Sequence, residues 1–211
     1  MTGRLAAAGV LLFTTVLFAT EPAFAQVAFV QGGITMDVRR FSGQPDTRVF
    51  DANVATATIG GGGFLTSLIS AGVELDMSRE SAVGEAAAVT IGGRPETITT
   101  TYSSNRRSVS ALFGIHSTAQ RAVRVGAYAG LAFTAFSQRI ATTAPPIILP
   151  SPPPAAEFTH LGANPIVGVD VAIAISRHFA LVGFARGQAL GFGSELHGFS
   201  VRPGVAARVS F

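Results

Sequence analysis

Four histidines are the side chains of this sequence best suited to acid–base chemistry near neutral pH. Hydrolytic catalysis would need one of them within hydrogen-bond reach of a serine nucleophile. His197 has Ser194 and Glu195 beside it in the sequence, but adjacent positions do not form a triad, and no His-x-Ser spacing occurs on any predicted strand. The other three are dispersed: His116, His160 and His178. The sequence therefore predicts that the protein is not an enzyme.

Metal and phosphate sites have no better support from residue type or spacing. The chain has no cysteine, its histidines are scattered and no acidic loop has calcium-binding spacing, so we expect no metal and no cofactor. The glycine runs Gly60–Gly63 and Gly92–Gly93 lead into no helix and precede no lysine, so they are not phosphate loops. A net charge of +3, from scattered arginines, also excludes nucleic acid as a partner.

The first 25 residues have the pattern of a cleavable secretory signal. Arg4 supplies the positive end, Leu5–Ala19 the apolar core, and Ala23–Ala25 an A-x-A cleavage site. A membrane anchor is the competing interpretation, but the apolar run is only about 15 residues, shorter than the roughly 20 that a spanning helix needs. We therefore divide the chain into a signal peptide, residues 1–25, and one domain, residues 26–211.

Beyond residue 25 the sequence alternates apolar and polar residues at a period of two, which is typical of β-strands. The alternating stretches span residues 28–38, 55–65, 69–78, 106–115, 123–135, 167–175, 179–188 and 201–211. The stretch at 179–188 is apolar on both faces, and we orient it so that Arg186 and Gln188 point inward. Short connections alternate with long ones at residues 40–53, 79–101, 140–157 and 189–198. The pattern predicts an all-β fold, an eight-stranded antiparallel up-and-down barrel.

The charges of these strands indicate which solvent the barrel faces. Only 13% of residues are charged, about half the share of soluble domains, and on several strands every charge falls on the row that also holds Gly, Ser and Thr. The other row is uncharged and would expose an apolar belt far larger than a soluble monomer tolerates. We therefore expect a transmembrane barrel, in which an arginine placed on the lipid face costs roughly 2–4 kcal/mol near the midplane.

The whole pattern resembles the small eight-stranded bacterial outer-membrane barrels, a group that includes the transmembrane domain of outer-membrane protein A, outer-membrane protein X and the opacity-type adhesins. The last strand, Arg202–Phe211, is similar to the terminal strand of that group. The resemblance implies a bacterial outer-membrane location, contact with outer-membrane lipid, and recognition of Gly204, Val209 and Phe211 by the barrel-assembly machinery. The chain lacks Trp and has two Tyr, so any aromatic girdle would be built from Phe64, Phe133, Phe179 and Phe199.

A barrel of eight strands is only just wide enough to be filled by its own side chains. The inward row carries ten charged residues that we expect to form a lumen charge network: Asp37, Arg39, Glu74, Asp76, Arg106, Arg124, Asp170, Arg186, Arg202 and Arg208. Opposite charges in so confined a space should pair, because an unpaired buried ion costs several kcal/mol. The sequence thus favours an ion-pair plug over an open channel.

These features favour a structural or surface-interaction protein, adhesin-like, with a closed lumen. A narrow porin-like channel for small solutes is the alternative, and a lipid-modifying enzyme the third possibility. The surface loops are the candidate contact for an unknown extracellular partner. The segment Pro145–Pro154, with Ile-Ile-Leu between prolines, is either a docking motif or a stiff, uncommitted loop.

Overall fold

The computed structural model describes residues 28–42, 50–117, 122–145, 148, 153–192 and 196–211. The predicted signal segment at 1–25 lies outside the described residues, as does most of the proline-rich segment at 145–154. Within the described ranges, no helix is long and apolar enough to cross a membrane.

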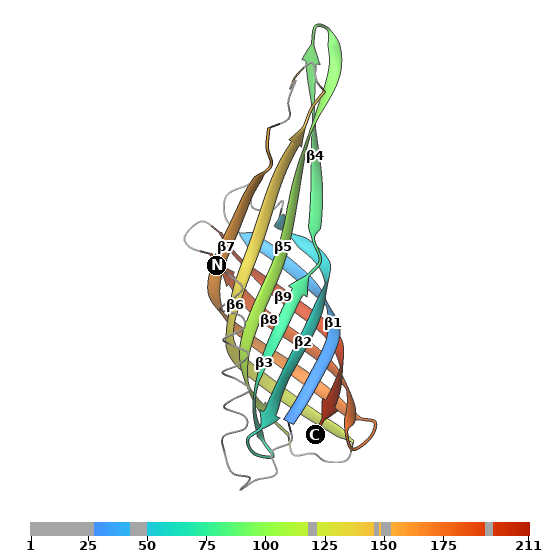
Figure 1. The fold of residues 1–211 in the computed structure, drawn as a ribbon, viewed down its shortest axis with the longest axis vertical. Helices are drawn as coiled ribbons and strands as arrows, with labels where there is room; N and C mark the ends of the chain where they lie inside the picture. Colours follow the sequence, from blue (N-terminus) through green and yellow to red (C-terminus); the bar gives the residue numbers. More distant parts are fainter. Residues whose placement is uncertain (1–27, 43–49, 118–121, 146–147, 149–152, 193–195) are drawn as a thin grey trace.

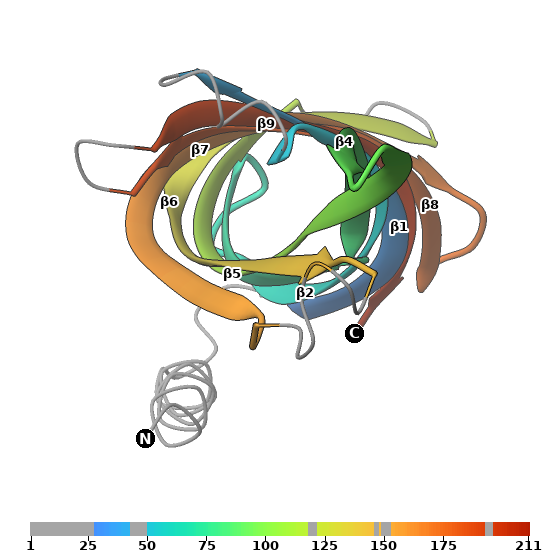
Figure 2. The ribbon, with the colours of Figure 1, turned by 90° about the horizontal axis from the view of Figure 1, so that it is seen from above.

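The described chain is a succession of antiparallel strands wound into a barrel (Figures 1 and 2). In chain order the strands are β1 (Ala28–Ser42), β2 (Ala52–Phe64), β3 (Ile69–Ser78), β4 (Ser81–Ile91), β5 (Arg94–His116), β6 (Val123–Thr143), β7 (Ala156–Ala174), β8 (Phe179–Gly191) and β9 (His197–Ser210). Neighbours in the wall are neighbours in sequence, apart from the seam where β1 pairs with β9 and the pairing of β3 with β5.

The wall counts eight strands because β3 and β4 pair with successive parts of β5. Ile69 to Met77 of β3 pair with the lower half of β5, and all of β4 pairs with its upper half. The β3–β5 pairing and the β1–β9 seam together close the ring, so the predicted eight-stranded antiparallel barrel is confirmed. Closure gives the wall strands partners on both sides, which removes the exposed edges of an open sheet.

Side chains alternate between lumen and exterior as their parity predicts. On β1, Thr35, Asp37 and Arg39 are buried in the lumen, whereas Ile34 and Met36 are exposed on the outside. The strand with ambiguous orientation, β8, also has the predicted register. Its Val182, Phe184, Arg186 and Gln188 face inward, while Phe179 and Leu181 face outward.

The prediction of a loop at residues 79–101 is wrong, because most of this segment forms a long hairpin. β4 pairs with the upper half of β5 from Ser81↔Ser104 to Ile91↔Arg94, and Gly92 and Gly93 make the two-residue turn. Both glycines have positive φ, 57° and 78°, the conformation that a tight hairpin turn with the right-handed twist of its strands requires. With the upper parts of β6 and β7, the hairpin forms a blade that rises beyond the barrel (Figure 1).

Two short turns at the opposite end of the barrel are built alike. In one, the Thr66 hydroxyl accepts hydrogen bonds from the backbone N–H groups of Leu68 and Ile69. In the other, the Ser176 hydroxyl accepts from those of His178 and Phe179. These side-chain caps fix the turns that join β2 to β3 and β7 to β8, and with them the rim at this end of the lumen.

Candidate functional site: a filled and charged lumen

The largest buried charge cluster lies in the half of the lumen nearer the long loops. The Asp37 carboxylate accepts a hydrogen bond from Nε of Arg106 at 2.9 Å and another from the Ser200 hydroxyl at 2.6 Å. Arg106 also donates to the Ser108 hydroxyl at 2.8 Å, and Ser108 in turn donates to Asp76 at 3.2 Å. Arg202 forms a salt bridge with Asp76, and the Gln188 side-chain oxygen accepts hydrogen bonds from Arg106 and Arg202. The cluster therefore draws residues from five strands of the wall: β1, β3, β5, β8 and β9.

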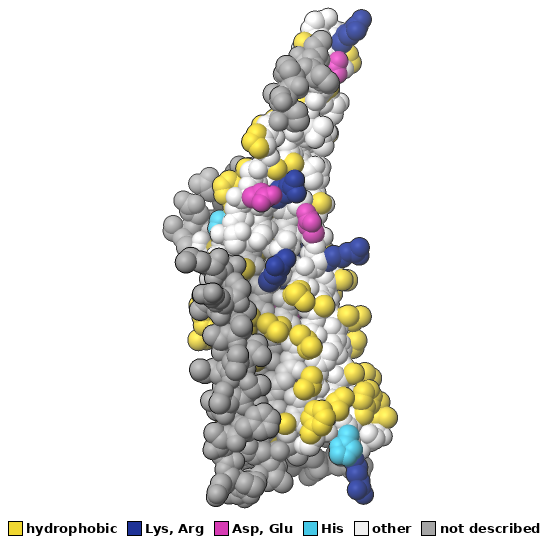
Figure 3. Space-filling model, in the orientation of Figure 1, with side chains coloured by type: hydrophobic (Ala, Val, Ile, Leu, Met, Phe, Trp, Pro, Cys, Tyr) yellow, Lys and Arg dark blue, Asp and Glu magenta, His cyan; other side chains and the backbone are white. Residues whose placement is uncertain are grey.

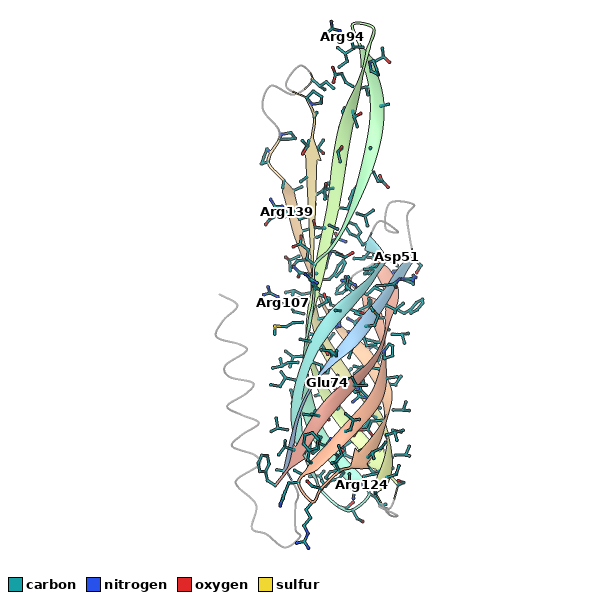
Figure 4. The ribbon with its side chains drawn as sticks, turned by 90° about the vertical axis from the view of Figure 1, so that its right-hand side faces the viewer. Asp51, Glu74, Arg94, Arg107, Arg124 and Arg139 are labelled. Atoms are coloured by element: carbon teal, nitrogen blue, oxygen red, sulfur yellow. The ribbon has the colours of Figure 1, made fainter. Side chains whose placement is uncertain are left out.

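Two further ion pairs continue the charged filling toward the short-turn end, the first of them at Glu74, which is labelled within the barrel in Figure 4. Arg186 lies 3.4 Å from the Glu74 carboxylate, and its guanidinium also stacks over the rings of Tyr128 and Phe184. Below it, Asp170 accepts hydrogen bonds from Arg208 at 2.8 Å and from the Tyr128 hydroxyl at 2.7 Å. The Arg186–Glu74 pair joins β8 to β3 across the lumen, and the Arg208–Asp170 pair joins β9 to β7, so both connect strands that are not neighbours in the wall.

An aromatic cluster covers the charged filling at the long-loop end. Its buried members are Phe41, Phe50, Phe136, Leu190, Phe192 and Leu196, with Tyr102 packed against them. We call this set the aromatic cap. The Phe41 and Phe136 rings lie 5.0 Å apart, and Phe136 stacks with Phe192 at 5.7 Å. Alternation of polar and apolar residues did not predict the cap, although the inward rows of β1, β6 and β8 turn apolar at Phe41, Phe136 and Leu190, which is the signal for it in the sequence.

The structure buries nine of the ten predicted lumen charges and brings these nine into salt bridges with one another. The longest of these contacts joins Arg39 and Asp37 at 3.7 Å, outside hydrogen-bond distance, and the Arg39 guanidinium stacks over Phe136 of the aromatic cap at 5.4 Å. Arg124 is the exception to burial. It is half-buried at the short-turn end, stacks over Phe64 at 4.5 Å and, among the described residues, forms no salt bridge. Phe64 therefore faces the lumen, so its predicted place in a lipid-facing girdle is wrong, whereas Phe133, Phe179 and Phe199 do face outward.

The terminal residues that the resemblance singles out lie on the seam strand. Gly204 pairs with Thr35 across the seam, and Val209 faces outward opposite Val30. The backbone N–H of Phe211 donates to the carbonyl of Ala28 at 2.8 Å, and its side chain is exposed. Recognition of Gly204, Val209 and Phe211 by an assembly machinery remains a prediction.

A serine–histidine contact that spacing along single strands did not reveal joins β3 and β5. The Ser70 hydroxyl lies 2.7 Å from Nε2 of His116, because the register sets Ser70 opposite Gly114, two residues from the histidine. Both side chains are buried, and the hollow beside Ser70 is only about 20 Å³, roughly room for one water molecule. Among the residues that the structure describes, no three His, Cys, Asp or Glu side chains converge to hold a metal ion.

The outer surface of the barrel is apolar over its middle height. On the face shown in Figure 3, hydrophobic side chains cover the wall, with charged ones above and below them. The exposed set includes Ile34, Ile59, Leu75, Phe113, Leu131, Val169, Leu181 and Val205, from all sides of the ring. Contact with water would make this exposed apolar surface unfavourable in free energy, whereas the acyl chains of lipids are themselves apolar and match it. We call it the apolar belt.

A closed eight-stranded barrel with a polar filling and an apolar belt defines the class of small transmembrane β-barrels of the outer-membrane type. No family model and no curated protein matches the sequence. Among solved structures, neisserial surface protein A is similar, at 13% identity and a TM-score of 0.53, over 88% of this chain and 96% of that one. Two others have TM-scores of 0.50: Ail, the attachment invasion locus protein of Yersinia pestis (8% identity, 88% and 99% of the chains), and a major outer membrane protein of Thermus thermophilus (12%, 89% and 100%). The predicted fold and outer-membrane location agree with these structures and with the apolar belt.

Proposed function

We propose that this chain is a structural or surface-interaction protein of the bacterial outer membrane whose lumen does not conduct. The observation that carries the proposal is the continuous filling of the barrel by ion pairs beneath the aromatic cap. Arg106, Arg202 and Arg186 each reach across the lumen to a carboxylate on another strand, so the pairs brace the barrel as well as closing it. The proposal includes no catalytic role, since the Ser70 hydroxyl has no room for a substrate beside it.

The blade supports the surface-interaction part of this proposal. In barrels of this type the short turns face the periplasm and the longer connections face the exterior, so the blade projects away from the cell. Val83, Ile98 and Phe158 lie on its inner face, and Val83 and Phe158 are exposed. Below the blade, the aromatic cap separates its surface from the lumen. A partner that binds the blade therefore contacts a surface that is separate from the ion pairs in the lumen.

Conductance tests the closed lumen. Purified protein inserted in planar lipid bilayers should give no steady unitary currents, because nine buried charges occupy the lumen beneath the aromatic cap. A barrel with an aqueous channel generally uses 16–18 strands. Insertion is checked by the shift in gel mobility between unheated and heated samples. Reproducible unitary currents from the intact protein would contradict the closed lumen and support the narrow-pore alternative.

Shortening the hairpin tests the interaction surface. Replacing residues 84–101 by Asn-Gly keeps the Val83↔Tyr102 pair and supplies residues suited to a two-residue turn. The shortened protein should still insert and retain its heat-dependent gel mobility, because the replaced part lies above the barrel. Non-adherent bacteria that display the intact chain should attach to surfaces or to one another, and those displaying the shortened chain should not. Equal attachment by both strains would remove the surface-interaction role.

A further inference from the structure

The short-turn end of the barrel contains a cavity of about 650 Å³ that opens away from the plug. Its walls come from the turns at Phe64–Ser67 and Ser176–His178 and from the ends of β6, β7, β8 and β9. The layer formed by Asp170, Arg208 and Tyr128 lies next to it toward the middle of the lumen. This volume falls within the roughly 300–1,000 Å³ of pockets that hold small ligands. We call it the periplasmic cup.

The charges that line the periplasmic cup are all positive. Arg124, Arg177 and Arg208 line it together with His178, and no Asp or Glu is among its described lining residues. The sequence between β5 and β6, residues 117–122, contains no acid either. Asp170 offsets only Arg208, with which it forms a salt bridge. The cup therefore holds an excess of positive charge with a concave shape that concentrates its field.

Two of these guanidinium groups are held in place before any ligand arrives. Arg124 stacks over the Phe64 ring at 4.5 Å, and Arg208 stacks over Phe29 at 4.7 Å. Arg208 also donates two hydrogen bonds to the Gln31 side chain, at 3.1 and 2.9 Å. A guanidinium held in this way loses little freedom on binding, and its donor fork matches the geometry of phosphate and carboxylate groups.

Apolar side chains complete the cup. Phe64 lines it beside the arginines, together with Ala172, Ala174 and Ala180 from the inward rows of β7 and β8. A bare inorganic anion would leave this part of the wall without a partner, whereas an anion attached to an apolar group would contact both kinds of side chain. Charge and wall chemistry thus point to the same class of ligand.

We propose that the periplasmic cup binds small amphiphilic anions, in which a phosphate group meets Arg124 and Arg177 and an apolar portion packs against Phe64 and Ala172. The phosphate belongs either to a soluble phosphate ester or to the headgroup of an anionic phospholipid in the facing leaflet. Binding here is separate from the blade and from the plug, so it adds a second, inward-facing activity to the barrel.

Calorimetric titration of the full chain in an uncharged maltoside detergent at low salt tests the site. Phenyl phosphate serves as the probe, with phenol and inorganic phosphate as partial probes. We expect saturable one-to-one binding of phenyl phosphate, weaker binding of inorganic phosphate and no binding of phenol. Arg124→Gln and Arg177→Gln should each weaken binding about tenfold, the effect of losing one charge-assisted hydrogen bond. Arg94→Gln, at the tip of the hairpin, is the matched control and should leave binding unchanged (Figure 4).

Several results would overturn the site. These are no binding of phenyl phosphate, equal binding of phenol, or an equal effect of Arg94→Gln and the two cup variants. Arg177 is exposed in a turn, so Arg177→Gln provides the test even if Arg124→Gln fails to fold. The titration is then repeated in nanodiscs of phosphatidylcholine with and without phosphatidylglycerol. Competition by phosphatidylglycerol would support a lipid headgroup as the occupant, and unchanged binding would support a soluble ester.

Discussion

Replacing Asp37 with asparagine is expected to lower the free energy of unfolding by about 3–5 kcal/mol, the cost of breaking a buried ion pair by removing one partner. Its carboxylate accepts hydrogen bonds from Arg106 and Ser200, and Nε of Arg39 is 3.7 Å away. Asparagine keeps the shape but not the charge, so two buried guanidinium groups lose their shared counter-ion. Denaturant-induced unfolding in lipid vesicles, followed by gel mobility, measures the change.

A control and a double variant separate charge from packing in this experiment. Glu85→Gln neutralises an exposed carboxylate on β4 and should change stability by no more than about 0.5 kcal/mol. Combining Asp37→Asn with Arg106→Gln should recover part of the loss, because the second change removes one of the stranded cations. An Asp37→Asn protein within about 1 kcal/mol of the wild type would show that the plug does not depend on this carboxylate.

Ile34→Arg is expected to destabilise the inserted barrel by roughly 2–4 kcal/mol, the cost of an arginine on the lipid face near the midplane. Ile34 is 67% exposed, and it pairs with Ala57 on one side and Val205 on the other, within the apolar belt. The side chain cannot turn inward, because strand parity directs it to the lipid. Reversible unfolding from vesicles gives the free-energy difference.

Ala88→Arg is the matched control for this second substitution. Ala88 is exposed on β4, in the blade above the apolar belt, where an arginine side chain meets water. We expect a change within about 0.5 kcal/mol. If Ile34→Arg and Ala88→Arg had equal effects, the surface around Ile34 would not face lipid, and the transmembrane placement would be wrong.

Strand parity predicted the barrel wall because each wall strand separates two different surroundings. The outer row meets lipid and the inner row meets polar side chains, so Ile34 and Thr35 differ in kind as well as in direction. Parity did not predict β4, because the blade has solvent on both faces and neither face favours apolar residues in one row. Along this part of β5, Thr97, Thr99 and Thr101 alternate with Ile98 and Thr100, so neither row is consistently apolar.

The inward charges could be predicted as a set, whereas their partners could not. Pairing depends on which residues the curvature and stagger of the wall bring together across the lumen, and the sequence does not state these. Asp76 thus meets Arg202 from the far side of the ring. The aromatic cap also draws Phe50, Phe192 and Leu196 from outside the alternating stretches, where parity carries no information.

Several residues of the ion-pair plug come from the last strand of the chain, so they join the barrel late in its assembly. Ser200, Arg202 and Arg208 all come from the final strand, and their carboxylate partners lie on β1, β3 and β7, up to 163 positions earlier in the chain. Before β9 joins the ring, Asp76 and Asp170 lack the arginines with which they form salt bridges in the closed barrel. Contacts between such distant segments form late in folding. Arrival of the last strand thus closes the wall and, in the same step, supplies the arginines that pair with Asp76 and Asp170.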